Sequence, residues 1–416
     1  MTHEGGPATD RTGQLSARRA IEALRCGVPS RDAVAALGSG QADVEDRFLT
    51  LLDGIGLAKR GGRRGLLLGA GFGAGKSHVL EHLAHLAAER GVVVSRVVIS
   101  KETPLHDPVK MLRAAVESAT LPGGSLGAVA EAAAGLDVGS PAYAELLSWA
   151  TGPAVSERFP LTLSLLPYAQ ENDGDFADAI VAFWSGDPLG VAELRRQARH
   201  AGKPKPTLAT VPARELARHR FRFLSRLFAA GGYEGWVLLL DEVELIGRYT
   251  PLQRGRSYAE LAGWLNADPD DPGSPLATVL AMTDDFDAAV LTAKNDREQI
   301  PARLRAKQTS DWDATAVDAE TGMRLVEKSM LLLDQPDAQE LDRAYAVLKL
   351  LHGEAFGWKT PDVAGLERLS ATRMRQYVRA WINEWDLVRL DPDYLPQTES
   401  IDVRPTYTEL ADLDRT

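Results

Sequence analysis

The sequence of 416 residues contains one cysteine, Cys26, and therefore no pair that could form an internal disulfide. A zinc site built from several cysteines is excluded for the same reason, and a reducing cytoplasm is the expected location. The sequence also lacks any run of eighteen apolar residues, and residues 1–16 are polar. We therefore expect neither a membrane span nor a signal peptide, and we expect residues 1–16 to be disordered.

Negative residues outnumber positive ones, 58 against 47, so the net charge of the chain is −11. This excludes a surface that is basic throughout, so any DNA contact would have to use a local patch. Residues 195–226 are such a patch, with ten lysines and arginines against one acid, Glu215. The segment could follow a phosphate backbone. Alternatively, its phenylalanines face the core and its arginines face solvent or the acidic remainder of the protein.

The most informative stretch is an apolar run followed by a glycine-rich loop, Lys76 and Ser77. The spacing is that of a phosphate-binding loop, with Ala70 where glycine is commoner. Glycines let backbone N–H groups close around phosphate oxygens, since they lack a Cβ and tolerate positive φ. We expect Lys76 to reach the β- and γ-phosphates, Ser77 to ligate Mg²⁺, and the helix over residues 75–90 to point its positive end at the nucleotide. The predicted nucleotide contacts are Gly71, Phe72, Gly73, Ala74, Gly75, Lys76, Ser77 and His78.

A second apolar strand ends in Asp241 and Glu242 and resembles the Walker B motif of P-loop ATPases. The resemblance implies that Asp241 holds Mg²⁺ through water and that Glu242 orients and deprotonates the attacking water. The alternative is a parallel strand followed by an acidic turn. A further strand over residues 277–282 ends in Thr283, where AAA+ ATPases place a polar residue that positions the water, with Asp284 as the neighbouring candidate.

Two groups of arginines are candidates for contacts with nucleotide. Arg303 and Arg305 follow the third strand and are candidates for reaching the γ-phosphate bound by a neighbouring subunit. On the last long helix we favour Arg375 over Arg373 and Arg379 as the lid arginine that touches nucleotide.

Three histidines, His78, His82 and His85, share one face of the helix after the phosphate loop. A zinc ion would need a fourth ligand, and helix faces carry histidines without metal far more often, so no zinc site is expected.

Several stretches together resemble the ATP-binding proteins of BREX-type bacterial phage-defence systems, the BrxC/BrxD-like AAA+ family, at the length of its shorter, BrxD-like members. The resemblance implies a cytoplasmic homo-oligomer that acts with other defence proteins, such as a helicase or a DNA-modifying partner. It also implies an α/β P-loop NTPase with a parallel sheet flanked by helices, a large helical insertion and a small helical lid. The residues that carry it are 19–25 with 27–29, 71–78, 100–105 with 107–108, 232–244 and 375–379.

The expected organisation follows from these motifs and from the helical and strand patterns between them. It consists of a disordered N-terminus over residues 1–16, helices over 17–60, an ATPase domain over 61–320 with its insertion at about 107–230, a lid over 321–390 and a tail over 391–416.

The predicted activity is Mg²⁺-dependent ATP hydrolysis that remodels or loads a partner on DNA. Lys76, Glu242 and Thr283 are the predicted catalytic residues, and Ser77 and Asp241 are the predicted metal ligands. The alternative is an ATP-dependent assembly switch or scaffold with negligible intrinsic hydrolysis. A small-molecule kinase is disfavoured, because adjacent Asp and Glu residues suit activation of water better than transfer to a metabolite.

Overall fold

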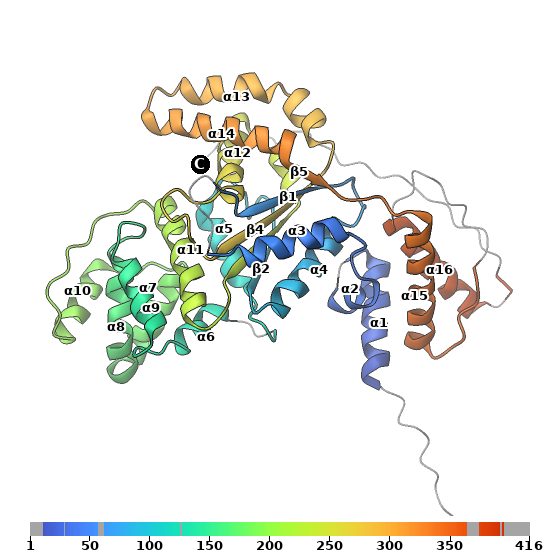
Figure 1. Ribbon diagram of the computed structural model, residues 1–416, viewed down its shortest axis with the longest axis horizontal. Coiled ribbons are helices and arrows are strands. Elements are labelled where there is room, and N and C mark those ends of the chain that lie inside the picture. The colour runs from blue at the N-terminus through green and yellow to red at the C-terminus, as the bar shows by residue number, and fades with distance from the viewer. Residues whose placement is uncertain are drawn as a thin grey trace, which may run out of the picture. The chain divides into compact units, whose positions relative to one another are not determined.

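A computed structural model describes residues 11–28, 30–56, 62–124, 127–363, 374–391 and 393–394. It contains a five-stranded parallel sheet flanked by helices, as predicted, with the strand order β2-β3-β4-β1-β5 (Figure 1). The strands are β1 (Gly65–Gly69), β2 (Val93–Val98), β3 (Trp236–Asp241), β4 (Leu276–Met282) and β5 (Met330–Leu332).

The central strand β3 pairs in parallel with β2 on one side and with β4 on the other. Val93 lies opposite Trp236, and Leu240 lies opposite Leu280. Every residue of β3 before Asp241 is buried. A strand covered on both faces reads as a continuous apolar run, which is why the sequence revealed this one.

The chain divides into two compact units. Unit 1 contains residues 1–46, 69–85 and 332–406, and unit 2 contains residues 47–68, 86–331 and 407–416. Two helices, α3 (Ala42–Asp53) and α4 (Lys76–Glu89), cross from one unit into the other.

In unit 2 the chain between β2 and β3 forms helices, drawn from teal through green to yellow-green in Figure 1. These are α5 (Pro108–Glu117), α6 (Ala128–Ala134), α7 (Pro141–Ala150), α8 (Arg158–Asn172), α9 (Gly174–Ser185), α10 (Val191–His200) and α11 (Ala213–Ala230).

The last of these helices, α11, packs on the sheet through aromatic rings. Phe221 and Phe228 lie against Trp236, with ring centroids 5.6 and 5.4 Å away. The indole N–H of Trp236 donates to Ser95 Oγ at 2.9 Å, and that hydroxyl donates to the carbonyl of Ala115 at 2.6 Å. These bonds satisfy the polar atoms buried where β3, β2 and α5 meet.

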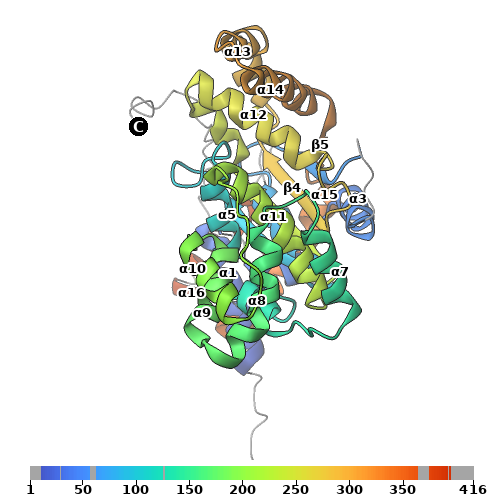
Figure 2. The same ribbon diagram turned by 90° about the vertical axis from the view of Figure 1, so that its left-hand side faces the viewer.

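A second set of helices in unit 2 stacks as layers in Figure 2: α12 (Pro251–Leu265), α13 (Asp296–Arg305) and α14 (Ser310–Ser329). Helices α12 and α14 approach closely at Gly322, where an added Cβ would lie 1.9 Å from the carbonyl oxygen of Tyr258. Only glycine fits there. Residue 321, where the sequence predicts the lid to begin, lies within α14, which packs against α12.

Unit 1 joins helices from both ends of the chain: α1 (Arg11–Cys26), α2 (Arg31–Leu37), α15 (Ala338–Phe356) and α16 (Met374–Leu390). Ile21, Leu348, Trp381 and Trp385 are buried in their shared core. Helix α2 is capped by Ser30, whose side chain accepts a hydrogen bond from the backbone N–H of Ala33.

The start of α1 differs from the prediction. The helix begins at Arg11, although residues 1–16 were expected to be disordered. Ser16 donates a hydrogen bond of 2.6 Å to Asp32 of α2, a tertiary contact that no local pattern reveals. Within the described residues, no helix combines the length and the apolar character needed to cross a membrane.

Candidate nucleotide-binding site

The predicted site residues fall in both units. The loop residues and Arg375 belong to unit 1, and Asp241, Glu242 and Thr283 belong to unit 2. Residue 373 lies outside the described residues.

The phosphate loop leaves the buried strand β1 and enters α4 at Lys76. Gly73 and Gly75 have φ of 78° and 103°, a region that side chains with a Cβ rarely adopt, whereas Gly71 does not have a positive φ. An added Cβ at Gly75 would meet no atom within 4 Å, so the loop is open above this residue. The strand, loop and helix thus follow one another as the motif requires.

Lys76 is buried and held back against the start of the loop. Its Nζ donates to the carbonyl oxygens of Ala70 at 2.9 Å and Gly71 at 3.3 Å. Residue 70 thus contributes a main-chain carbonyl, which alanine supplies as well as glycine does. This explains why the departure from the commoner motif is tolerated.

A pocket in unit 1 opens beside the phosphate loop. Gly73, Ala74, Gly75, Ser77 and His78 line one side of it. The opposite sides come from the ends of α1 and α2, from the start of α15 and from α16, and they are largely apolar. These residues include Leu24, Val28, Leu37, Ala344, Met374 and Val378.

Polar groups are placed at the edge of this pocket. His78 Nε2 donates to the carbonyl oxygen of Gly38 at 2.7 Å, and burial lowers the pKa of His78 so that the ring stays neutral. Glu340 and Arg343 of α15 also line the pocket, and burial raises the pKa of Glu340. Sequence reasoning missed Arg343, since no motif marks its position.

Arg375 lies beside the phosphate loop and lines the pocket. Its guanidinium carbon is 5.8 Å from the centre of the Phe72 ring. Gly27 also lies close to the Arg375 side chain, because an added Cβ at this glycine would be 3.5 Å from Arg375 Cδ. Arg379 of the same helix is exposed and does not line the pocket.

The acidic pair in unit 2 lies at the carboxyl end of β3. Asp241 Oδ1 accepts a hydrogen bond of 2.8 Å from the backbone N–H of Glu242. Glu242 is exposed and has a φ of 55°, which costs a residue with a Cβ roughly 1–2 kcal/mol. Such strain is typical of functional positions, and it turns the chain into the short helix η1 (Val243–Arg248).

Thr283 directly follows β4, which is paired in parallel with β3. The carboxyl ends of parallel neighbours meet at one edge of a sheet, so Thr283 and Asp241 share that edge. Thr283 is only 1% exposed, whereas the competing residue Asp284 is exposed. Because Thr283 is buried, its hydroxyl is held more firmly than the exposed carboxylate of Asp284. This favours Thr283 over Asp284 as the residue that would position the water.

Residues 14–131 match the family model described as BREX system ATP-binding protein BrxC/D. The predicted family resemblance is confirmed. The BrxC/D match covers the phosphate loop and the α2 side of the pocket beside it. Comparisons with curated proteins and with solved structures found no significant match.

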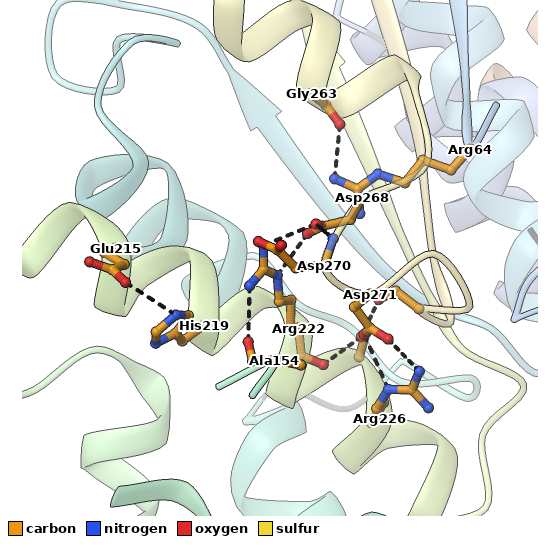
Figure 3. Close-up of polar contacts among 12 residues, drawn as sticks. Arg64, Ala154, Glu215, His219, Arg222, Arg226, Gly263, Asp268, Asp270 and Asp271 are labelled. Carbon is orange, nitrogen blue, oxygen red and sulfur yellow. Dashed lines mark hydrogen bonds and ion pairs between the residues drawn. The ribbon is translucent and has the colours of Figure 1, made fainter. Parts of the chain in front are cut away.

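The basic segment 195–226 is only partly available to a partner. Arg222 binds Asp268 and Asp270, each at 2.7 Å, and Arg226 binds Asp271 at 2.6 Å (Figure 3). Both interactions hold α11 to the chain between α12 and β4.

The neighbouring Arg220 is 4% exposed. It donates to the carbonyls of Phe183 and Asp187, and burial lowers its pKa to about 10. Phe221, Phe223 and Phe228 of α11 are buried in the core. This agrees with the second interpretation of residues 195–226, in which the phenylalanines face the core.

The candidate arginines of α13 and His82 of α4 do not line the pocket beside the phosphate loop. Arg305 pairs with Glu320 at 2.8 Å, and Arg303 is exposed on α13. His82 lies 3.1 Å from Glu45. Within the described part of the chain, no cluster of three or more histidine, cysteine or acidic side chains has a metal-binding arrangement.

Proposed function

We propose that this protein is a magnesium-dependent ATPase that remodels or loads a partner on DNA in a BREX phage-defence system. The observation that carries the proposal is the pocket in unit 1, where an apolar wall adjoins a phosphate loop whose lysine is already ordered. The match to a family described as ATP-binding supports ATP as the nucleotide.

The residues of unit 1 would bind the nucleotide. The apolar wall would receive the adenine ring, and the N–H groups of the loop from Gly73 to Ser77 would surround the phosphates. Lys76 would exchange its two carbonyl partners for phosphate oxygens. Arg375 would contact the nucleotide from a lid formed by α15 and α16.

Mg²⁺ would be held by the Ser77 hydroxyl and, through water, by Asp241. These are oxygen donors of the kind that Mg²⁺ prefers, and the Asp241 carboxylate is already oriented by the N–H of Glu242. When bound, the ion would neutralise charge on the β- and γ-phosphate oxygens.

Hydrolysis would depend on Glu242 and Thr283. Glu242, exposed at the sheet edge in its strained conformation, would orient the attacking water and accept its proton. The buried Thr283 hydroxyl would fix that water or the γ-phosphate by a hydrogen bond. A positioned general base typically contributes 10²–10⁴-fold to rate.

Assembly and partners follow from the same proposal. AAA+ enzymes complete their sites at subunit interfaces, so we expect a homo-oligomer in which Arg303 or Arg305 reaches the neighbouring site. Other defence proteins, among them a helicase, are the proposed partners.

Steady-state ATP hydrolysis by the full chain tests this function, with and without single- and double-stranded DNA. Lys76→Ala should abolish turnover by removing the phosphate contact, and Glu242→Gln should reduce it at least about 100-fold while ATP still binds. Glu298→Gln removes an exposed carboxylate of α13 and serves as the matched control. Equal turnover by wild type and Glu242→Gln would refute hydrolysis at this site, and ATP binding without turnover would favour the assembly switch.

A further inference from the structure

The pocket of unit 1 contains a carboxylate that the proposed binding of phosphate and metal does not use. Glu340 belongs to α15 and lines the pocket one helical turn before Ala344, a residue of the apolar wall. The phosphate loop from Gly73 to Ser77 lines another side. Glu340 is therefore placed with the surface proposed to receive the base and not with the loop proposed to hold the phosphates.

The Glu340 carboxylate lies against main chain that has no side chain to displace it. Gly40 has a φ of 68°, and an added Cβ there would be 1.9 Å from Glu340 Oε1. A side chain at position 40 would therefore push the carboxylate away. The residues on both sides of this glycine, Gly38, Ser39 and Gln41, line the pocket. The carboxylate is thus held beside the stretch of chain that forms the pocket wall.

No protein donor satisfies this carboxylate in the described part of the chain. A glutamate at the third position of a helix commonly accepts a hydrogen bond from the backbone N–H of the capping residue. The cap Asp337 accepts from the N–H of Glu340 at 2.8 Å, but among the described residues the Glu340 carboxylate returns no hydrogen bond and forms no ion pair. Burial raises the pKa of Glu340, and the nearby charge of Arg343 opposes that rise. A donor on a ligand would stabilise the ionised carboxylate.

Other polar side chains of the pocket wall already have partners within the protein. The Gln41 amide donates to the carbonyl of Asp334 at 3.1 Å and accepts from the N–H of the same residue at 2.8 Å. Ser39 Oγ donates to Glu45, and His78 donates to a main-chain carbonyl. These side chains fix the pocket wall and are not available to read a base.

A carboxylate distinguishes purines by the group that they carry at C6. Ionised carboxylate oxygens accept hydrogen bonds and donate none. Adenine carries an amino group at C6, which donates, whereas guanine and hypoxanthine carry an oxygen, which would leave the carboxylate unsatisfied. Glu340 is half-buried, whereas Asp334 and Arg343, which also line the pocket, are exposed. Water competes for any contact that these two exposed side chains make with a base.

We propose that Glu340 selects adenine nucleotides by accepting a hydrogen bond from the amino group at C6 of the base. This inference rests on the proposed function, because it takes the unit 1 pocket to be the ATP site. It goes beyond that function by naming the residue that rejects nucleotides with an oxygen at C6. Glu340 determines specificity and does not touch the reacting phosphate.

Calorimetric binding of ATP and of inosine triphosphate to the full chain, each with Mg²⁺, tests the proposal. Inosine triphosphate carries an oxygen where ATP carries the amino group at C6. Wild type should bind ATP at least about tenfold more tightly, because the hydrogen bond involves a charged acceptor. Glu340→Gln keeps the shape of the side chain but can present either an oxygen or an N–H group, so this preference should fall about tenfold. The matched control Glu354→Gln removes an exposed carboxylate of α15 that does not line the pocket and should keep the wild-type preference.

Binding of 2′-deoxy-ATP separates a contact with the base from a contact with the sugar. Glu340→Gln should leave the ratio of affinities for ATP and 2′-deoxy-ATP unchanged, and a change in that ratio alone would overturn the proposal. Equal weakening of ATP and inosine triphosphate by Glu340→Gln would also overturn it, because the effect would then be structural. An unchanged preference in Glu340→Gln, an equal loss in the Glu354→Gln control, or a wild type that binds both nucleotides equally would do the same while the proposed function stands. The absence of ATP binding by wild type would contradict the proposed function and this inference with it.

Discussion

Replacing His106 with phenylalanine should make the stability of the protein less sensitive to acid. Burial lowers the pKa of His106 from 6.5 to about 4, and the positive charges of Arg214, Arg256 and Lys110 act in the same direction against Asp107. The ring meets Tyr249 edge-on at 5.3 Å, a contact that phenylalanine keeps. His106→Phe therefore removes the titration with little change in shape.

The direction and size of this pH effect on the free energy of unfolding follow from the pKa values of His106 in the folded and unfolded chain. The folded chain takes up this proton with a pKa of about 4 and the unfolded chain with a pKa of 6.5, so the unfolded state gains protons first as pH falls. Stability is lost from about pH 6.5 downward until the folded value is reached. Between pH 7 and pH 5 this one histidine lowers the free energy of unfolding by about 2 kcal/mol.

Urea unfolding of both full-length proteins at a series of pH values measures the effect. The difference in free energy of unfolding between His106→Phe and wild type should shift by about 2 kcal/mol in favour of the variant between pH 7 and pH 5. The other histidines titrate equally in both proteins and cancel. Parallel curves for the two proteins would show that His106 is not held neutral by its surroundings.

Two further substitutions separate folding from function. Arg222→Met should lower the free energy of unfolding by about 3–5 kcal/mol, because Asp268 and Asp270 lose their buried partner. The control Arg195→Met, on the exposed face of α10, should change the free energy of unfolding little. A mild effect of Arg222→Met in urea unfolding would contradict the ion-pair reasoning. Glu242→Gly should leave stability unchanged or raise it by up to about 1 kcal/mol by relieving the positive φ, while ATP turnover falls at least about 100-fold. Retained turnover would remove Glu242 from the mechanism.

Elements with a strong local pattern were predictable from the sequence. Strand β3 is a continuous apolar run, and Ser30 caps α2 as its position before a helical pattern predicts. The phosphate loop was recognisable because its glycine spacing is set by the backbone, and Gly73 and Gly75 have the positive φ that it requires.

Features that depend on distant contacts were not predictable. The partners of Arg222 lie 46 and 48 residues further along the chain, so charge counting could not show that this arginine is buried in an ion pair. Helix α14 continues past residue 321 and packs on α12 through Gly322, a close approach that local helical spacing does not reveal. The apolar wall of the pocket comes from both ends of the chain, and no motif joins them.

Equilibrium binding of ATP with Mg²⁺ to the full chain, measured by calorimetry, tests the central claim most directly. Wild type should bind with saturable affinity, and Lys76→Ala should bind at least about tenfold more weakly, because the lysine contact with phosphate is charge-assisted. Tripolyphosphate should bind more weakly than ATP, because it leaves the apolar wall beside the loop unfilled. The absence of ATP binding by wild type, or equal binding by Lys76→Ala, would contradict the assignment of the unit 1 pocket as a nucleotide site.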